Sequence, residues 1–291
     1  MMTVTHVPHN KLNLRIGGEL RTYDRGITNE ELMQAVPSVF QVQSHESRSS
    51  RFAPISTIKV IEELRKEGFV PCYAMQSKAR DESKIDFTKH RIHLRPVDYD
   101  YRKDWNEIIL VNANDGSSSY QLSAGRFRLV CSNGLVLGDR DRSQVIYHKG
   151  SHVERDVIEG AFTVVKEFDE TDRLRLEMEK IMLTDKERKQ LAFLSMVMCT
   201  GSTSTDDFKF EPAKLLTPRR REDTIKPDLW STFNIIQENA IKGGVKYYNG
   251  ETDRNATSRE IKSISKNMDI NRALWKTATL MVEDKQTVLT A

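Results

Sequence analysis

The chain has 291 residues, of which 38% are hydrophobic and 30% are charged, and its formal net charge is +3. This composition is typical of a globular protein with a well-solvated surface and excludes wholesale disorder. The sequence contains no run of about 18 apolar residues and no apolar block near its start, so we expect neither a membrane span nor a signal peptide. We therefore expect a cytoplasmic protein that does not contact the membrane.

The three cysteines, Cys72, Cys131 and Cys199, lie far apart and lack the CxxC spacing of a metal site. An odd number without that spacing argues against both a disulfide framework and a zinc site. His148 and His152 are four residues apart, but the residues between them are poor helix formers, so a metal site there is not favoured. We expect no metal and no cofactor.

The first half of the chain predicts a mixture of helices and strands. Residues 1–27 show no clear period and are expected to be flexible, whereas Thr28 and Glu31 form a capping box that opens a helix. That helix should end before Pro37. A second helix is expected over 56–67, followed by strands at 69–79, 89–97 and 106–113 and short strands at 135–139 and 143–150. Residues 118–134 fit a helix or a strand.

The second half predicts helices. We expect them over 154–168, 169–183, 184–198, 228–244 and 257–284, with capping boxes at Thr184–Glu187 and Thr257–Glu260. The fold class is therefore α+β: an N-terminal antiparallel or mixed sheet with flanking helices, followed by a mostly helical C-terminal half. The expected division is 1–27, 28–152 and 153–291, the last including a loop at 200–227, although 28–291 could form one continuous domain.

The strongest candidate for a binding site is the basic strand KHRIHLRP. Side chains of a strand alternate between its faces, so Ile92 and Leu94 should face the core. The basic residues should then share the opposite face at a spacing of about 7 Å, which suits contacts to successive phosphates. The alternative is an ordinary solvated face whose charges pair with nearby acids. The basic residues of this strand are Lys89, Arg91, His93 and Arg95.

Two further clusters of arginines are candidate phosphate contacts. Arg126 and Arg128 flank Phe127 and would share a face if this segment is a strand, but not if it is a helix. The second cluster, immediately before the helix expected at 228–244, would need an anion between it and the helix N-terminus. That anion could be an acid of this chain or a bound phosphate. The cluster consists of Arg219, Arg220 and Arg221.

The helix expected at 228–244 carries an apolar stripe and several polar side chains. Trp230 and Phe233 belong to the stripe that should face the core. Asn234, Gln237 and Glu238 lie beside it, and such groups either satisfy neighbouring backbone or hydrogen-bond a partner. With Tyr120 and Phe127, this helix completes the candidate set for base stacking or partner contact.

Several long segments resemble an uncharacterised family of phage- and plasmid-borne proteins that is known as a domain of unknown function. They include SHESRSSRF, DFTKHRIHLRP, NANDGSSSYQLSAGRFRLVCSNGL and LLTPRRREDTIKPDLWSTFNIIQENAIKGG. The resemblance spans about residues 28–280 and implies an accessory protein of a mobile element. One position departs from the pattern: Asn114 stands where the family resemblance leads us to expect a histidine, which weakens any catalytic role there.

Three functions are consistent with these patterns. The leading hypothesis is binding of DNA, most of all single-stranded DNA, during recombination, annealing or DNA entry, by analogy with annealing proteins built from a small sheet and a helix. The second is a protein-binding inhibitor of a host defence or replication factor. The third is a phosphodiester-cleaving enzyme, for which no acidic motif is recognisable, although His45 could act as a general base or be a surface residue. A homo-oligomer is compatible with all three.

Overall fold

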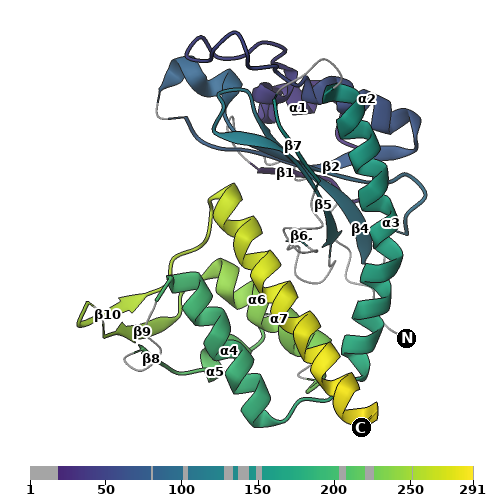
Figure 1. Ribbon diagram of the computed structural model, residues 1–291. Coiled ribbons are helices and arrows are strands. Elements are labelled where there is room, and N and C mark those ends of the chain that lie inside the picture. Colours follow the sequence, from purple (N-terminus) through teal and green to yellow (C-terminus); the bar gives the residue numbers. More distant parts are fainter. Residues whose placement is uncertain are drawn as a thin grey trace. The chain divides into compact units, whose positions relative to one another are not determined.

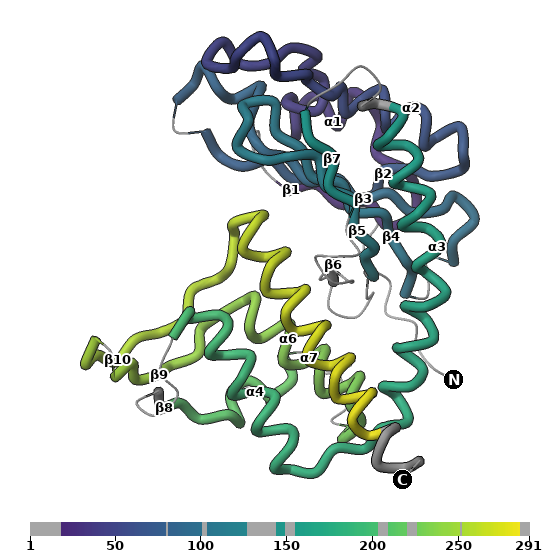
Figure 2. Tube along the Cα trace, in the orientation of Figure 1, coloured from purple at the N-terminus to yellow at the C-terminus, as the bar shows by residue number. Residues whose placement is uncertain are grey.

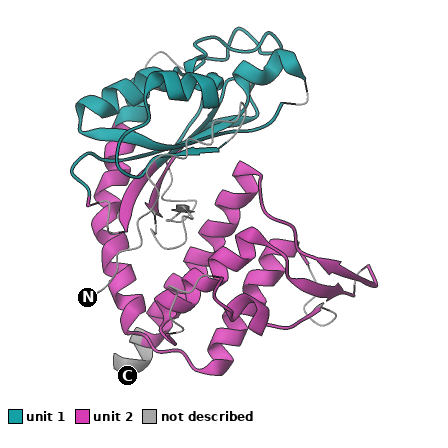
Figure 3. Ribbon diagram, turned by 180° about the vertical axis from the view of Figure 1, so that it is seen from behind, with its two compact units in different colours: residues 1–99, 109–121, 145–158 teal, residues 100–108, 122–144, 159–291 magenta. Residues whose placement is uncertain are grey.

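A computed structural model of the protein describes residues 19–79, 81–100, 104–127, 134–136, 144–148, 153–202, 208–219, 226–250 and 252–290. Its internal contacts divide the chain into two compact units (Figure 3). Unit 1 comprises residues 1–99, 109–121 and 145–158, and unit 2 comprises residues 100–108, 122–144 and 159–291.

Unit 1 contains the start of an antiparallel sheet with helices on one face (Figure 1). The capping box at Thr28 and Glu31 forms as expected and opens the first helix. Apolar side chains of alternate strand positions, such as Leu20, Ala74 and Ile92, are buried beneath the helices. The elements of this unit are β1 (Glu19–Arg21), α1 (Asn29–Ala35), η1 (Pro37–Phe40), α2 (Thr57–Lys66), β2 (Phe69–Gln76), η2 (Glu82–Phe87), β3 (His90–Pro96) and β7 (Gln144–Ile146).

The sheet has the strand order β1-β2-β3-β4-β5-β6, with β7 also paired to β5. Four elements contribute to both units: β4 (Trp105–Ala113), β5 (Ser118–Phe127), β7 and α3 (Val153–Lys180). β6 (Gly134–Val136) belongs to unit 2. The ambiguous segment at 118–134 therefore starts as a strand. β1 lies within residues 1–27, which were expected to be flexible, but it pairs with β2 as an ordered strand.

Unit 2 is mainly helical, and its centre is α6. This helix is buried along nearly all of its length and packs against α4, α5 and α7 (Figure 2). The Phe233 ring lies between two tryptophan rings, with centroids 5.9 Å from Trp230 and 6.0 Å from Trp275. The remaining elements are α4 (Asp185–Thr200), β8 (Phe208–Phe210), α5 (Ala213–Leu216), α6 (Leu229–Lys242), β9 (Lys246–Asn249), β10 (Arg254–Thr257) and α7 (Ile264–Thr290).

The expected fold class is confirmed, but two of the local predictions were wrong. The helices expected at 154–168 and 169–183 form one continuous helix, α3, because neither glycine nor proline lies at the expected boundary between residues 168 and 169 and ion pairs such as Arg173–Glu170 support the helix there. The capping box expected at Thr257 and Glu260 does not form. Thr257 pairs with Lys246 as the last residue of β10, and Glu260 instead forms an ion pair with Lys242.

Candidate nucleic-acid interface

The alternation of side chains along β3 is as predicted, but the exposure of its basic face is not. Ile92 and Leu94 are 0% exposed. On the other face, Arg91 is 7% exposed, and it donates to the Tyr73 hydroxyl at 3.0 Å. The His93 ring is 0% exposed and lies 4.6 Å from the Tyr73 ring. The prediction of a solvent-facing phosphate track is therefore wrong at these positions, because both side chains pack around a buried tyrosine.

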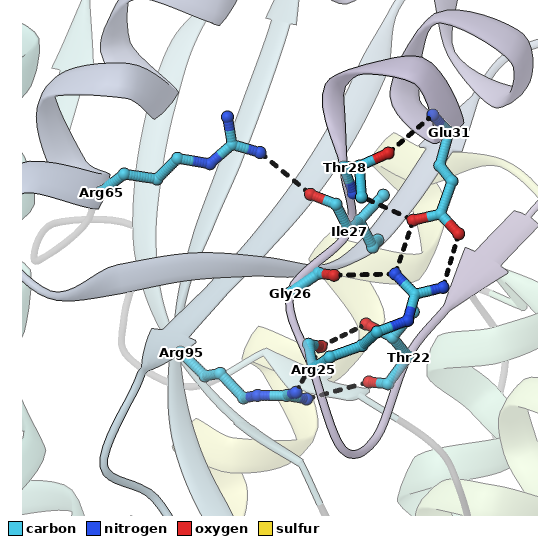
Figure 4. Close-up of polar contacts among 8 residues, drawn as sticks. All are labelled: Thr22, Arg25, Gly26, Ile27, Thr28, Glu31, Arg65 and Arg95. Carbon is cyan, nitrogen blue, oxygen red and sulfur yellow. Dashed lines mark hydrogen bonds and ion pairs between the residues drawn. The ribbon is translucent and has the colours of Figure 1, made fainter. Parts of the chain in front are cut away.

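Arg95, on the same face, is 0% exposed and serves the backbone of unit 1 (Figure 4). Its guanidinium donates to the carbonyl oxygens of Thr22 at 2.9 Å and Arg25 at 2.6 Å. It also lies 3.9 Å from the centre of the Tyr99 ring. Arg95 thus fixes the turn between β1 and α1. Of the four basic residues in the predicted track, Lys89 is half-buried and keeps substantial contact with solvent.

The second predicted cluster is only partly described. Arg126 is 8% exposed, forms an ion pair with Asp172 and donates to the Asn106 side-chain oxygen at 3.0 Å. Phe127 ends β5, and Arg128 lies outside the described residues. Tyr120 is 0% exposed, so it offers no ring face for a base.

The third cluster is represented by Arg219, because Arg220 and Arg221 lie outside the described residues. The Arg219 side chain donates to the Asn239 side-chain oxygen at 2.6 Å and to the carbonyl oxygen of Gly243. Both acceptors lie in the last turn of α6 and just beyond it. The N-terminus of α6 is capped by Asp228, whose carboxylate accepts the Ser231 amide at 2.7 Å. An acid of the chain itself therefore lies at the helix N-terminus, where a bound phosphate was the alternative.

The polar side chains of α6 are used internally. Asn234 donates to the carbonyl oxygen of Trp230 at 2.7 Å, and Gln237 donates to the Asn271 side-chain oxygen at 2.8 Å. Glu238 is 3% exposed and Trp230 is 7% exposed, so neither presents an open surface. Of the two alternatives for these groups, the structure supports internal hydrogen bonding.

Unit 1 contains a buried chain of hydrogen bonds centred on His90. Ser38 donates its hydroxyl to the Gln76 side-chain oxygen at 2.9 Å, so it must accept from His90 Nδ1, also at 2.9 Å. His90 Nε2 is then the acceptor for the Thr57 hydroxyl at 2.9 Å, and Thr57 in turn accepts from Asn112 at 3.1 Å. These directions fix one neutral tautomer of His90, and burial lowers its pKa to about 4.

Asn114 and His45 lie next to this network. The Asn114 side chain donates to the backbone carbonyl oxygen of Gln41 at 2.9 Å, and the backbone carbonyl oxygen of Asn114 accepts the His45 amide at 3.1 Å. His45 Nδ1 accepts the Ser47 amide at 3.2 Å and lies 2.9 Å from the Ser47 hydroxyl. His45 is 6% exposed, so the expectation of a surface residue is wrong. These contacts hold the loop that precedes Arg48 in place.

His148 also has a structural environment. Its Nδ1 lies 3.0 Å from the Ala53 carbonyl oxygen, and its ring stacks on Phe52 with centroids 4.4 Å apart. Burial lowers the pKa of His148. His152 lies outside the described residues. Within the described ranges, no group of three or more histidine, cysteine or acidic side chains is arranged to hold a metal ion.

Unit 2 presents a small exposed sheet that the sequence patterns did not reveal. The strands β8, β9 and β10 are antiparallel, and the β9–β10 hairpin projects from the helices of this unit (Figure 1). Phe210, Tyr247 and Ala256 are paired across the sheet and therefore share one face. The Phe210 ring stacks on Phe193 of α4 at 6.0 Å, so this face packs on the helices.

The opposite face of this sheet, which we call the lysine face, is turned away from α4. Lys209, Tyr248 and Asn255 lie directly opposite one another on the three strands, and Lys246 pairs with Thr257. Tyr248 is half-buried and the other four are exposed. The lysine face therefore places an aromatic ring next to two lysines, one on the neighbouring strand and one on its own strand. It consists of Lys209, Lys246, Tyr248, Asn255 and Thr257.

The sequence does contain a signal for this hairpin. In KYYN the lysine and the second tyrosine are two residues apart, and the following NGETD is rich in turn-forming residues. A strand of four residues without an aliphatic side chain gives too short a period-2 pattern to stand out. The lysine face forms only when three separate segments pair, so no single stretch of the sequence predicts it.

The part of the chain that the structure describes has no helix with the length and apolar character needed to cross a membrane. A family model described as "Domain of unknown function (DUF932)" matches residues 44–275. The protein "UPF0380 protein YafZ" of Escherichia coli (strain K12) is 40% identical over 263 residues, which cover 90% of this chain and 94% of that relative. "UPF0380 protein YfjQ" of the same organism is 39% identical over equal shares of both chains. No solved structure matches the chain.

Proposed function

Because the chain belongs to the family described as a domain of unknown function (DUF932), whose description states no activity, we propose a function from the chain's own surfaces. It binds DNA, with a preference for single strands, as an accessory protein of a phage or plasmid. The observation that carries this proposal is the lysine face, where Lys209 and Lys246 flank Tyr248 on an exposed sheet.

The charge of this face suits a polyanion. Among the described residues, neither Lys209 nor Lys246 forms an ion pair, so both ammonium groups can neutralise phosphates. Lys246 is two residues from Tyr248 on the same strand, which separates their side chains by about 7 Å. Lys209 lies directly across from Tyr248, at about 5 Å between Cβ atoms. An extended nucleic-acid strand can therefore contact both lysines while passing over the ring.

The preference for single strands follows from the aromatic side chain. Tyr248 is half-buried, so part of this residue is open to solvent. Stacking on such a ring requires a base that is not already stacked and paired in a duplex. The sequence resemblance to phage and plasmid proteins supports a role in the host cell cytoplasm, where recombination, annealing or entry of DNA exposes single strands.

The test is fluorescence anisotropy of a labelled 20-nucleotide single strand at several salt concentrations. The wild-type protein is expected to bind more weakly as salt rises. Replacing both lysines, in a Lys209→Gln, Lys246→Gln variant, removes two phosphate contacts. The slope of log affinity against log salt should then fall by about 1.4, which corresponds to a loss of about 25-fold at 0.1 M salt if affinities converge near 1 M.

A matched control places the same charge change elsewhere in unit 2. Lys186 and Lys189 are exposed on α4, so a Lys186→Gln, Lys189→Gln variant has the same net charge as the test variant. It should keep the wild-type slope, because overall charge alone contributes weakly at moderate salt. Equal losses in both variants, or no salt-dependent binding by the wild-type protein, would overturn the proposal. Binding of the duplex as tightly as the single strand would remove the preference.

A further inference from the structure

The turn of the β9–β10 hairpin carries an unusual backbone conformation beside Tyr248. Asp253 has φ +50°, and within the described ranges it is the one residue other than glycine with a positive φ. Such a conformation is uncommon for a residue with a side chain, although aspartate tolerates it better than most. Residues in this region persist where their surroundings hold them, and they gather at functional sites.

The Asp253 side chain makes a specific contact in this conformation. Its Oδ1 accepts a hydrogen bond from the Tyr248 hydroxyl at 2.7 Å. The chain reverses between Asn249 and Arg254, which are paired across the hairpin, so Asp253 lies just beyond the end of β9. The carboxylate therefore anchors the far end of the tyrosine ring, while the sheet anchors its Cβ atom.

We infer that Asp253 is a positioning residue that holds the Tyr248 ring as a stacking platform for one unpaired base. This inference rests on the proposed function and specifies how the lysine face recognises single strands. A ring fixed at both ends loses little rotational freedom when a base stacks on it, so binding is strengthened without a further contact. The lysines supply attraction that is independent of sequence, and the ring supplies the contact that distinguishes a base from bare backbone.

The lysines and the tyrosine ring should affect two different measurable quantities. Phosphate contacts determine the salt dependence of binding, whereas stacking determines the difference between a normal oligonucleotide and one of equal length whose sugars carry no bases. A Tyr248→Leu variant should bind the normal oligonucleotide about tenfold more weakly, with an unchanged salt slope. Its affinity for the abasic oligonucleotide should equal that of the wild-type protein.

The anchor is tested by two substitutions of Asp253. Glycine adopts positive φ without strain, so Asp253→Gly keeps the turn but removes the acceptor for the tyrosine hydroxyl. Loss of the carboxylate charge acts equally on both oligonucleotides, so we expect the preference for the normal over the abasic oligonucleotide to fall about threefold. Asp253→Asn loses the same charge but keeps an oxygen acceptor and also tolerates positive φ, so it should keep the wild-type preference for the normal oligonucleotide. Tyr248→Phe should behave like Asp253→Gly, because it lacks the hydroxyl.

The outcomes separate this inference from the proposed function. If the wild-type protein binds neither oligonucleotide, the proposed function fails and the inference fails with it. If it binds both equally, DNA binding stands and the stacking platform is overturned. If Tyr248→Leu lowers the preference for the normal oligonucleotide but Asp253→Gly does not, the ring is a contact and Asp253 is not its positioning residue. Thermal unfolding of each variant checks that the hairpin remains folded.

Discussion

Replacing Arg95 by methionine should lower the free energy of unfolding by about 3–5 kcal/mol, although methionine fills much of the same space. The guanidinium is 0% exposed and satisfies the carbonyl oxygens of Thr22 and Arg25. Without it, two carbonyl oxygens lose charge-assisted hydrogen bonds in a site that water reaches poorly. Contact with the Tyr99 ring is lost as well. Denaturant unfolding of the wild-type and variant proteins measures the difference.

Arg25 provides the control for this substitution because it lies in the same turn (Figure 4). Its side chain is 44% exposed and forms an ion pair with Glu31. Exposed ion pairs contribute little, so Arg25→Met should cost about 1 kcal/mol or less. Equal effects of the two substitutions would show that Arg95 is not a structural cation. Arg95 would then return to consideration as a binding residue.

The case of Arg95 shows where sequence patterns reach their limit. Alternation along β3 correctly placed Ile92 and Leu94 on the buried side and the basic residues on the other. Alternation does not reveal what covers that other face. The acceptors of Arg95 lie about seventy residues away in the chain. They are backbone carbonyl groups, which every residue has, so the sequence does not indicate which of them accept a hydrogen bond. A cationic strand face therefore looks the same whether it is solvated or buried.

Local signals predicted local structure well. The capping boxes that open α1 and α4 form with both of their hydrogen bonds, because each depends on residues only three positions apart. The box expected at Thr257 failed where a non-local interaction competed, since β-pairing with Lys246 held its backbone in a strand. The lysine face was missed for the same reason: Lys209, Lys246 and Asn255 become neighbours only through pairing of three segments.

The polar network around His90 should have a second large effect on the free energy of unfolding, and this effect depends on pH. His90 is fully buried, and its pKa falls from 6.5 to about 4 because burial disfavours the imidazolium. Between these values the unfolded chain binds a proton that the folded protein does not bind. The free energy of unfolding therefore rises with pH across this window: the full stability is present above pH 6.5, and it is lost progressively as the pH falls towards 4.

The size of the effect follows from the shift in pKa. One pKa unit corresponds to about 1.4 kcal/mol, so His90 should remove about 3 kcal/mol of stability between pH 7 and pH 4. A His90→Gln variant can still accept from Thr57 and donate to Ser38, but it does not titrate. It should be less stable than wild type at pH 7, since an amide does not reproduce the ring geometry, and the difference should shrink as the pH falls.

The comparison with the variant isolates His90 from the other groups that titrate in acid. Hydrogen bonds and ion pairs lower the pKa of Glu31 and of Glu187, the latter to about 2, so their contributions are lost at lower pH in both proteins. His148, whose pKa is also lowered, contributes equally to both. A difference between wild type and His90→Gln that stays constant from pH 7 to pH 4 would contradict a buried neutral His90. A converging difference would show that the folded protein keeps His90 neutral, as its place in the buried chain of hydrogen bonds from Asn112 to Gln76 requires.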